Sequence, residues 1–200
     1  VPGSALQLTN YVDVPIINAG DGTHEHPTQA LLDMMSIKEK FGKLEGLNIG
    51  IVGDVLHSRV ALSNIFGLVK MGANVKLCAP PHLIPRNIES LGATITYSID
   101  ELLNWADAVN VLRIQRERMG VGIIPSIREY RNFFGITNER MKRIKKEIII
   151  MHPGPINRGV EIDSDVADSE QAIILDQVLN GVALRMSVLY LLLGGSGIEK

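Results

Sequence analysis

The chain has 200 residues, of which 46% are hydrophobic and 21% charged, and its formal net charge is −2. This composition excludes a disordered chain, and the near-neutral charge disfavours nucleic acid and anionic membranes as partners. The uninterrupted apolar runs, such as 148–151 and 188–193, are far shorter than the roughly 20 residues that cross a bilayer, so no membrane span is expected. The single cysteine, Cys78, excludes an internal disulfide, and the first residues lack a basic and apolar leader. We therefore expect a cytoplasmic protein.

Short apolar runs alternate with longer amphipathic segments along the chain. This alternation predicts an α/β fold with a mostly parallel sheet flanked by helices. In chain order, strands are predicted at 13–18, 47–52, 74–79, 94–97, 108–112 and 147–151. Helices are predicted at 27–41, 58–71, 99–105, 137–145 and 169–193. The first helix has Pro27 at a suitable first position and Gly42 after its last turn.

The last predicted helix is the longest, and its apolar residues recur at spacings of three and four. They are Ile173, Ile174, Val178, Val182, Met186 and Leu189. This spacing predicts that one apolar face packs on a core. The basic cluster within 140–146 has no interleaved aromatic residues, so a solvated helix face is favoured there over a phosphate site.

Four polar stretches each begin where a predicted strand ends. They are NAGDGTHEHPTQ from Asn18, GDVLHSRVA from Gly53, LRIQRER from Leu112 and HPGPINRGVEI from His152. Ligands of open α/β sheets bind in the crevice at the carboxyl ends of the strands. The four stretches are therefore expected to meet at one pocket.

The first and fourth stretches suit a polar, amide-like ligand. His26 and Gln29 lie at the start of a predicted helix, where His26 could donate to an oxyanion and Gln29 could bind an amide. In the alternative interpretation His26 is only a helix cap and Gln29 an ordinary first-turn residue. The sequence Pro-Gly-Pro at 153–155 lacks two N–H donors, which leaves carbonyl groups as acceptors. In the alternative interpretation, 153–155 forms only a rigid turn that binds no ligand.

The second and third stretches suit a dicarboxylate. Arg59 falls in the first turn of a predicted helix, where the helix dipole disfavours a cation, so a functional reason is indicated. Arg113 and Gln115 are two residues apart beyond a strand, which places both side chains on one face. Two guanidinium groups beside one pocket bind two carboxylates well. Alternatively, 116–118 forms a solvated turn with surface ion pairs.

The motifs HPTQALLD, GDVLHSRVA, RIQRER, HPGPINRGVEI and QVLNGVALRM, in this order, resemble the aspartate/ornithine carbamoyltransferase family. The resemblance extends to about Leu193, and the HSR and RxQ elements are similar to the aspartate version. It implies transfer of the carbamoyl group from carbamoyl phosphate to L-aspartate, in pyrimidine biosynthesis. It also implies a Rossmann-like aspartate domain with the C-terminal edge of a second α/β domain. The reaction needs no covalent intermediate, no metal and no cofactor.

The resemblance also assigns roles to residues. His26 matches the residue that hydrogen-bonds the carbamoyl oxygen and stabilises its negative charge. Carbamoyl phosphate binding is further implied for Gln29, Gly154 and Pro155. Aspartate binding through its two carboxylates is implied for Arg59, Arg113 and Gln115.

Family members carry a Ser-Thr-Arg-Thr-Arg phosphate loop and a lysine loop upstream of these motifs, and neither is present here. We therefore expect 1–35 to end the carbamoyl-phosphate domain and 36–170 to form the aspartate domain. Residues 171–193 would return to the first domain, and 194–200 would form a tail. The resemblance implies a catalytic homotrimer, with regulatory chains as a further possibility, and this chain alone is expected to lack full activity. The alternative is a non-catalytic dicarboxylate-binding or assembly fragment.

Two other classes of protein share features with this sequence. A metal-dependent hydrolase could use ligands from among His24, His26, Asp54, His57 and His152. It is disfavoured because the chain is too short for the usual eightfold barrel. A nucleotide-binding module is suggested by LNIGIVGD, but the turn after it lacks the pattern G-x-G-x-x-G.

Overall fold

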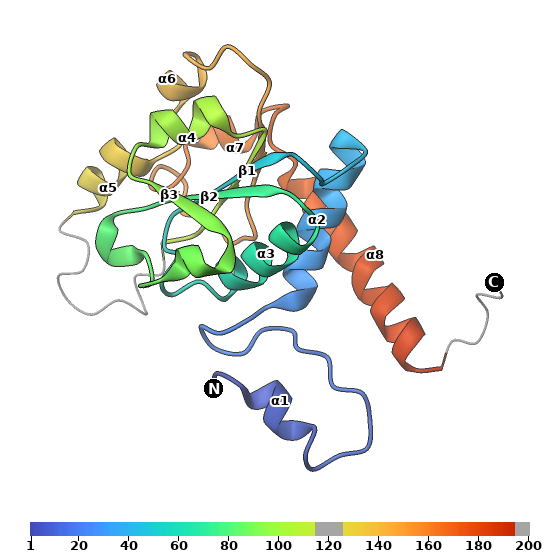
Figure 1. Cartoon of the computed structure of the whole chain (residues 1–200). Helices are drawn as coiled ribbons and strands as arrows, with labels where there is room; N and C mark the ends of the chain where they lie inside the picture. The colour runs from blue at the N-terminus through green and yellow to red at the C-terminus, as the bar shows by residue number, and fades with distance from the viewer. Residues whose placement is uncertain (115–125, 195–200) are drawn as a thin grey trace.

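A five-stranded parallel sheet forms the centre of the computed structural model, which describes residues 1–114 and 126–194 (Figure 1). Its strand order is β3-β2-β1-β4-β5. The strands are β1 (Asn48–Val52), β2 (Asn74–Cys78), β3 (Ala93–Thr96), β4 (Ala108–Val111) and β5 (Ile149–Met151). All four neighbouring pairs are parallel, which confirms the predicted α/β fold.

Helices flank this sheet, and along the chain they precede, connect or follow its strands. They are α1 (Ser4–Leu8), α2 (Pro27–Phe41), α3 (Arg59–Lys70), α4 (Ile99–Trp105), α5 (Ile127–Phe134), α6 (Asn138–Met141), α7 (Ser164–Ala167) and α8 (Ile174–Leu192). Two short 3-10 turns, at Pro81–Leu83 and Ile88–Leu91, precede β3. The helix α2 has the predicted bounds, and Gly42 ends it in the left-handed conformation that glycine adopts without strain.

The sheet is buried on both faces, as its apolar strands require. On one face Ile49 and Ile51 of β1 join the core formed with α3, and on the other face Val52 joins the core formed with α4. The intervening Gly50 lets α4 approach closely, because a Cβ atom there would lie 3.1 Å from the Leu102 side chain.

The direction in which strands are added changes between β1 and β4, which makes this the topological switch point of the sheet. Open α/β sheets bind ligands at such a point. Here Gly53 leaves β1 with φ at +125°, and a Cβ atom would lie 2.6 Å from the Leu112 carbonyl oxygen. Glycine at position 53 therefore permits the close approach of the chain segments that lead to Arg59 and Arg113.

The predicted strand at 13–18 is wrong, because this segment is irregular. Pro15 lies at its centre, and proline cannot donate a hydrogen bond to a neighbouring strand. Val14 is 64% exposed, so the short apolar run in this segment does not reflect burial in the described chain. The first polar stretch therefore follows an irregular segment rather than a strand.

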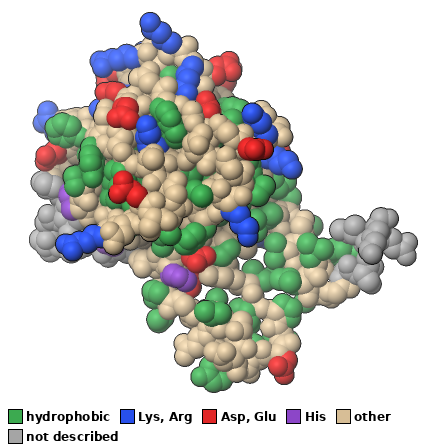
Figure 2. Space-filling model, in the orientation of Figure 1, with side chains coloured by type: hydrophobic (Ala, Val, Ile, Leu, Met, Phe, Trp, Pro, Cys, Tyr) green, Lys and Arg blue, Asp and Glu red, His purple; other side chains and the backbone are tan. Residues whose placement is uncertain are grey.

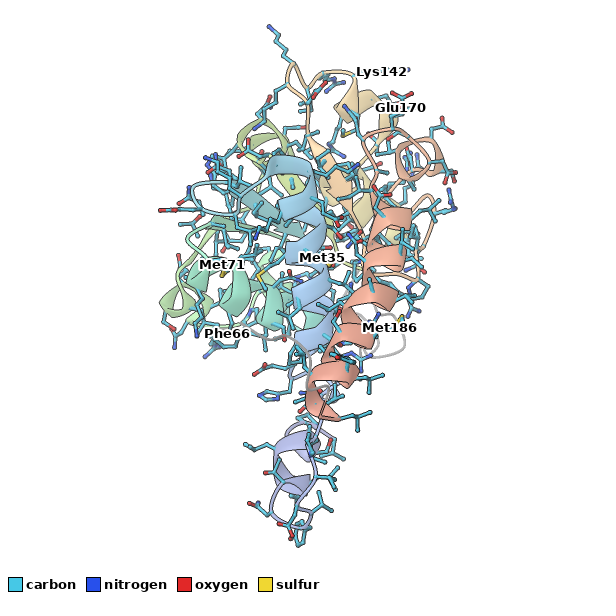
Figure 3. All side chains as sticks on the ribbon, turned by 90° about the vertical axis from the view of Figure 1, so that its right-hand side faces the viewer. Met35, Phe66, Met71, Lys142, Glu170 and Met186 are labelled. Carbon is cyan, nitrogen blue, oxygen red and sulfur yellow. The ribbon has the colours of Figure 1, made fainter. Side chains whose placement is uncertain are left out.

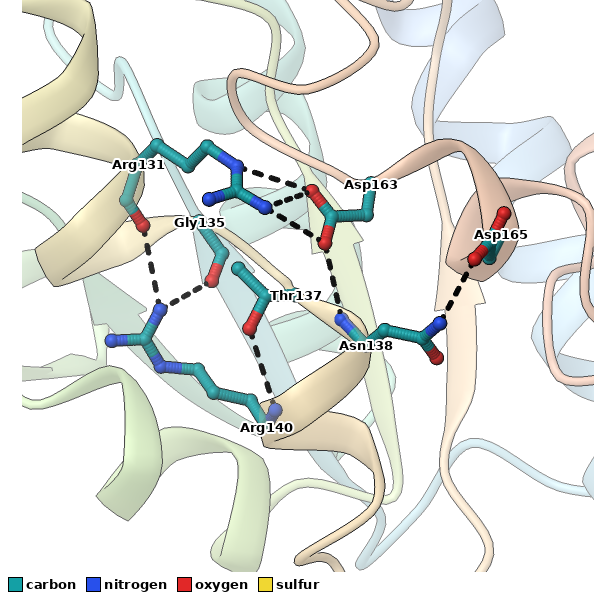
Figure 4. A network of polar contacts seen from close by, with 7 residues as sticks. All are labelled: Arg131, Gly135, Thr137, Asn138, Arg140, Asp163 and Asp165. Carbon is teal, nitrogen blue, oxygen red and sulfur yellow. Dashed lines mark hydrogen bonds and ion pairs between the residues drawn. The ribbon is translucent and has the colours of Figure 1, made fainter.

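The predicted helix at 137–145 is shorter than expected, since α6 ends at Met141. Arg140 is not part of a solvated face: its guanidinium donates to the carbonyls of Gly135 at 2.8 Å and Asn132 at 2.6 Å. Figure 4 shows the contact of Arg140 with Gly135 and, beside it, the pairing of Arg131 with Asp163 at 2.7 Å. These contacts fasten α5, which the sequence did not predict, to α6 and to the start of α7.

The apolar face predicted for the last helix is buried only at its start in the described chain, where Ile173 is part of the core. Helix α8 begins at Ile174, and it packs on α2 through Gln177 and Asn180, which are buried, while Val178 and Met186 are 64% and 65% exposed. In Figure 3, α8 and α2 lie side by side and Met186 lies on the outer part of α8. Figure 2 shows hydrophobic side chains gathered over α8 and the N-terminal segment. The apolar periodicity is real, but in this chain it faces outward.

Helix α8 is also long and apolar enough to cross a membrane, by length and composition alone. The uninterrupted apolar runs within it, such as 188–192, are much shorter than the helix itself. One side of α8 is committed to protein contacts: Asn180 Nδ2 donates to Ser36 Oγ at 3.0 Å, and Lys40 pairs with Asp176 at 3.1 Å.

The close approach of Gly53 to Leu112 can be tested by comparing Gly53 with Gly42, which also has a left-handed backbone but has no neighbouring atoms where a Cβ would lie. Gly53→Ala should lower the free energy of unfolding by about 3 kcal/mol or more, because strain and a backbone clash add. Gly42→Ala, which meets no atom within 4 Å, should lower it by only about 1 kcal/mol. Urea unfolding measures both. Equal losses would contradict the close approach of Gly53 to Leu112.

Candidate functional site

A cavity of about 190 Å³ lies at the carboxyl edge of the sheet. It is lined by His26, Gln29, Ser58, Arg59, Val60, Arg113, Pro153, Gly154 and Pro155. The structure thus brings together His26, Gln29, Arg59, Arg113, Gly154 and Pro155, all expected at the site from the sequence. Gln115, the remaining predicted residue, lies outside the described residues.

Three neighbouring strands supply three walls of this cavity. Arg59 follows β1, Arg113 follows β4, and Pro153 follows β5, and these strands are adjacent in the sheet. The fourth wall is the start of α2, with His26 and Gln29. The expectation that strand ends build the pocket is therefore confirmed for three of the four stretches.

Arg59 is the first residue of α3 and so lies in the first turn, as predicted. Ser58 caps this helix by accepting from the Ala61 N–H at 3.3 Å. Arg59 is therefore not needed as the cap. A Cβ atom on Gly20 would lie 2.5 Å from the Arg59 guanidinium carbon. The guanidinium therefore lies directly against the backbone of the first polar stretch, which explains the glycine there.

His26 occupies the N-cap position of α2, but its side chain makes no capping hydrogen bond. Its backbone N–H donates to Ser63 Oγ at 2.9 Å, which joins α2 to α3. Burial and, to a lesser extent, the positive charges of Arg59 and Arg185 together lower the pKa of His26 to about 4. The imidazole is therefore neutral at pH 7. The alternative that His26 acts only as a cap is not supported by this geometry.

The loop after β5 presents acceptors to the cavity. The Gly154 N–H donates to His152 Nδ1 at 2.9 Å, and prolines stand on both sides of Gly154. His152 is buried, and its own N–H donates to Gln177 Oε1 at 2.9 Å. The N–H groups of 152 and 154 are thus occupied, and only carbonyl groups of 153–155 remain for a ligand.

Behind the cavity lies a carboxylate that the sequence analysis missed. Asp33 is fully buried, and four side-chain amides donate to it. The donors are Gln29 at 3.0 Å, Asn64 at 2.8 Å, Asn110 at 3.0 Å and Gln177 at 2.8 Å. Burial raises the pKa of Asp33, and the four hydrogen bonds oppose that rise.

A signal for this cluster was present in the sequence. Asp33 follows Gln29 by one helical turn and shares the buried side of α2 with Ile37. Asn110 likewise interrupts an apolar strand. Polar residues at positions where apolar ones are expected must find partners when buried. The sequence does not reveal, however, that these residues partner one another.

Three of the four histidines in the metal alternative are each paired with a different carboxylate. His24 contacts Asp21 at 3.1 Å, His57 contacts Asp54 at 2.8 Å, and His152 contacts Glu161 at 3.4 Å. Across 1–114 and 126–194, no three His, Cys, Asp or Glu side chains are grouped so that they could hold a metal ion. The turn after β1, which begins Gly53-Asp54-Val55, lacks the glycine pattern of a dinucleotide site.

Two family descriptions match the chain. Residues 45–192 match the aspartate/ornithine carbamoyltransferase Asp/Orn binding domain, and residues 1–39 match the carbamoyl-P binding domain of the same family. The first match includes α8.

Individual relatives agree with this assignment. The aspartate carbamoyltransferase catalytic subunit of Christiangramia forsetii is 60% identical over 96% of this chain, and that of Halothermothrix orenii is 55% identical over 96%. The chain spans 62% of the length of each. Among solved structures, the catalytic subunit of M. jannaschii aspartate transcarbamoylase superposes with a TM-score of 0.80 at 36% identity, covering 100% of this chain and 66% of that one. Ornithine carbamoyltransferase from Pyrococcus furiosus gives a TM-score of 0.80 at 28% identity, covering 96% and 64%.

The neutral state of His26 can be tested by an NMR titration of its ring protons. The midpoint should lie at about pH 4, and Arg59→Met should raise it, because a nearby positive charge is removed. Arg128→Met, at an exposed residue of α5 outside the cavity, is the matched control and should leave it unchanged. A midpoint near 6.5 in the folded protein would contradict the burial of His26 beside Arg59.

Proposed function

Because the chain belongs to the aspartate/ornithine carbamoyltransferase family, we propose that it supplies the aspartate-binding part of an aspartate carbamoyltransferase. The enzyme would transfer the carbamoyl group of carbamoyl phosphate to L-aspartate, giving N-carbamoyl-L-aspartate and phosphate for pyrimidine biosynthesis. One observation carries the proposal: a single cavity combines two arginines, a neutral histidine and a wall of carbonyl groups. These groups match two carboxylates, a carbamoyl oxygen and a carbamoyl NH2 group.

Aspartate rather than ornithine is the proposed amino acid. Arg59 and Arg113 can each receive a carboxylate, whereas the cationic side chain of ornithine would be repelled by them. The fold does not separate the two substrates, since structures of both enzymes superpose equally well. The relatives named above support aspartate by their names. Gln115, two residues beyond Arg113, remains a proposed third contact.

The carbamoyl group is proposed to lie between α2 and the loop after β5. Its NH2 group would donate to Gln29 and to carbonyls at Gly154 and Pro155. Its oxygen would accept from His26. The Thr28 hydroxyl lies 3.4 Å from His26 Nδ1, and by donating there it would favour the tautomer that carries its proton on Nε2.

The reaction then requires only positioning and stabilisation of charge. The neutral amine of bound aspartate attacks the carbamoyl carbon, and the new C–N bond forms as negative charge grows on the carbamoyl oxygen. The Nε2–H of His26 stabilises that charge. The bond from the carbon to the phosphate oxygen breaks, its electron pair leaves with phosphate, and phosphate accepts the proton from the amine. No metal and no cofactor takes part in this sequence.

We propose the following organisation for the whole enzyme. Residues 1–35 end the carbamoyl-phosphate domain, 36–170 form the aspartate domain, and 171–193 return to the first domain, with 194–200 as a tail. The exposed apolar side of α8 would then be covered by that first domain. The groups that bind phosphate would belong to the part of the relatives that this chain does not span. Catalytic homotrimers, regulatory chains and a cytoplasmic location complete the proposal.

The role of the two arginines is tested by calorimetry with N-carbamoyl-L-aspartate. Arg59→Met and Arg113→Met should each weaken binding by about tenfold to 100-fold, because each removes a charge-assisted hydrogen-bond donor to a carboxylate. The control is Arg143→Met, which removes an exposed arginine outside the cavity and should leave the affinity unchanged. Unchanged binding in both cavity variants would refute the assignment.

The contribution of the phosphate groups is tested by a steady-state assay of this polypeptide alone. We expect no appreciable transferase turnover, because the loss of one oxyanion donor already costs on the order of 100-fold to 1000-fold in rate and several phosphate ligands are lacking together. The catalytic subunit of M. jannaschii, assayed in parallel, serves as the positive control. Ordinary turnover by the 200-residue chain would contradict the expectation.

A further inference from the structure

The buried Asp33 carboxylate has no part in the proposed reaction, yet it contacts residues behind three walls of the cavity. It accepts from Gln29 on α2, Asn110 on β4 and Gln177 on α8. We propose that Asp33 is a positioning residue: it holds the Gln29 amide with its carbonyl oxygen toward the cavity, so that the cavity selects an NH2 donor. This inference rests on the proposed function and specifies how the carbamoyl group is recognised.

The orientation of two of the amides around Asp33 is fixed by backbone groups. Gln177 Oε1 accepts from the His152 N–H, which can only donate, so the Gln177 nitrogen must face Asp33. The Asn64 nitrogen lies 3.2 Å from the Val60 carbonyl oxygen, which can only accept, and also donates to Asp33. Each oxygen of the carboxylate therefore already accepts one hydrogen bond whose direction is settled independently.

Asp33 then dictates how Gln29 is turned. Gln29 Nε2 lies 3.0 Å from Asp33 Oδ1. If the amide were turned over, its oxygen would take that place beside a carboxylate oxygen, and two acceptors would repel each other. The nitrogen therefore stays on Asp33, and Gln29 Oε1 is left for a donor in the cavity that Gln29 lines.

The same carboxylate also positions the opposite wall. Gln177 bridges from Asp33 Oδ1 to the N–H of His152, and His152 Nδ1 in turn accepts from the Gly154 N–H. This chain of hydrogen bonds leaves carbonyl groups as the acceptors of the Pro153–Pro155 wall. A carbamoyl NH2 group has two hydrogens, and the cavity thus offers acceptors on two sides.

The test compares two ligands that differ in one group. N-carbamoyl-L-aspartate carries NH2 where N-acetyl-L-aspartate carries a methyl group, and both present the same two carboxylates. Calorimetric titration of the 200-residue chain should show a preference of on the order of tenfold for the carbamoyl ligand, since the acetyl ligand leaves buried acceptors without donors. This preference is the ratio of the two dissociation constants.

Asp33→Ala should reduce that ratio to within about threefold of unity. Water can enter the space that is vacated, and because water both donates and accepts, it does not fix the direction of the Gln29 amide. Asp33→Glu retains a group that only accepts and should restore most of the preference. The matched control is Ser36→Ala, which removes a buried hydrogen bond between α2 and α8 one turn further along. It should lower stability without changing the ratio.

If Asp33 has a merely structural role, Asp33→Ala would weaken the binding of both ligands equally and leave the ratio of their dissociation constants unchanged. That result would overturn the inference. Failure of the wild-type chain to bind either ligand would refute the proposed function, whereas equal binding of both would refute this inference alone. If Asp33→Ala does not fold, hydrogen exchange of the Gln29 side-chain NH2 group in the wild type gives the answer. If the Gln29 NH2 hydrogens are protected from exchange both with and without ligand, the inference is supported. Rapid exchange of these hydrogens in the folded chain contradicts it.

Discussion

The structure depends on one constraint: a carboxylate placed in the interior must be surrounded by donors. Asp33 meets it with amides from α2, α3, β4 and α8, four elements that are distant in sequence. An unpartnered buried charge is strongly destabilising, so these elements must keep their relative positions for the fold to persist. Three of them, α2, α3 and β4, also lead into the cavity, and the geometry of the site is therefore tied to the stability of the core.

The cavity combines this rigid base with a simple distribution of charge. Positive groups follow β1 and β4, acceptors follow β5, and a neutral imidazole stands at the start of α2. Anionic substrates are thus met by a few arginines at strand ends, which is consistent with a net charge of only −2. A broadly basic surface would attract anions in general, whereas two guanidinium groups held in fixed positions favour a ligand whose two carboxylates have a matching separation.

The local features of the fold could be predicted from the sequence. Helix α2, the five strands of the sheet and the position of Arg59 follow from apolar periodicity, proline and glycine signals, and the rule that loops at strand ends bind ligands. Long-range features could not. The segment at 13–18 contains a short apolar run like that of a strand, but it pairs with no strand in the described chain. The apolar side of α8 predicts burial that α2 does not supply. The Asp33 cluster was missed because no local pattern tells which buried polar residues will meet.

The central claim is that one cavity binds a carbamoyl group and two carboxylates together. The most direct measurement is a crystal structure of the chain grown with N-carbamoyl-L-aspartate. The account predicts one carboxylate on Arg59, the other on Arg113, and the NH2 group between Gln29 and the carbonyls of 153–155. A ligand bound elsewhere, or bound here with its carbamoyl oxygen rather than its NH2 group against Gln29, would contradict it.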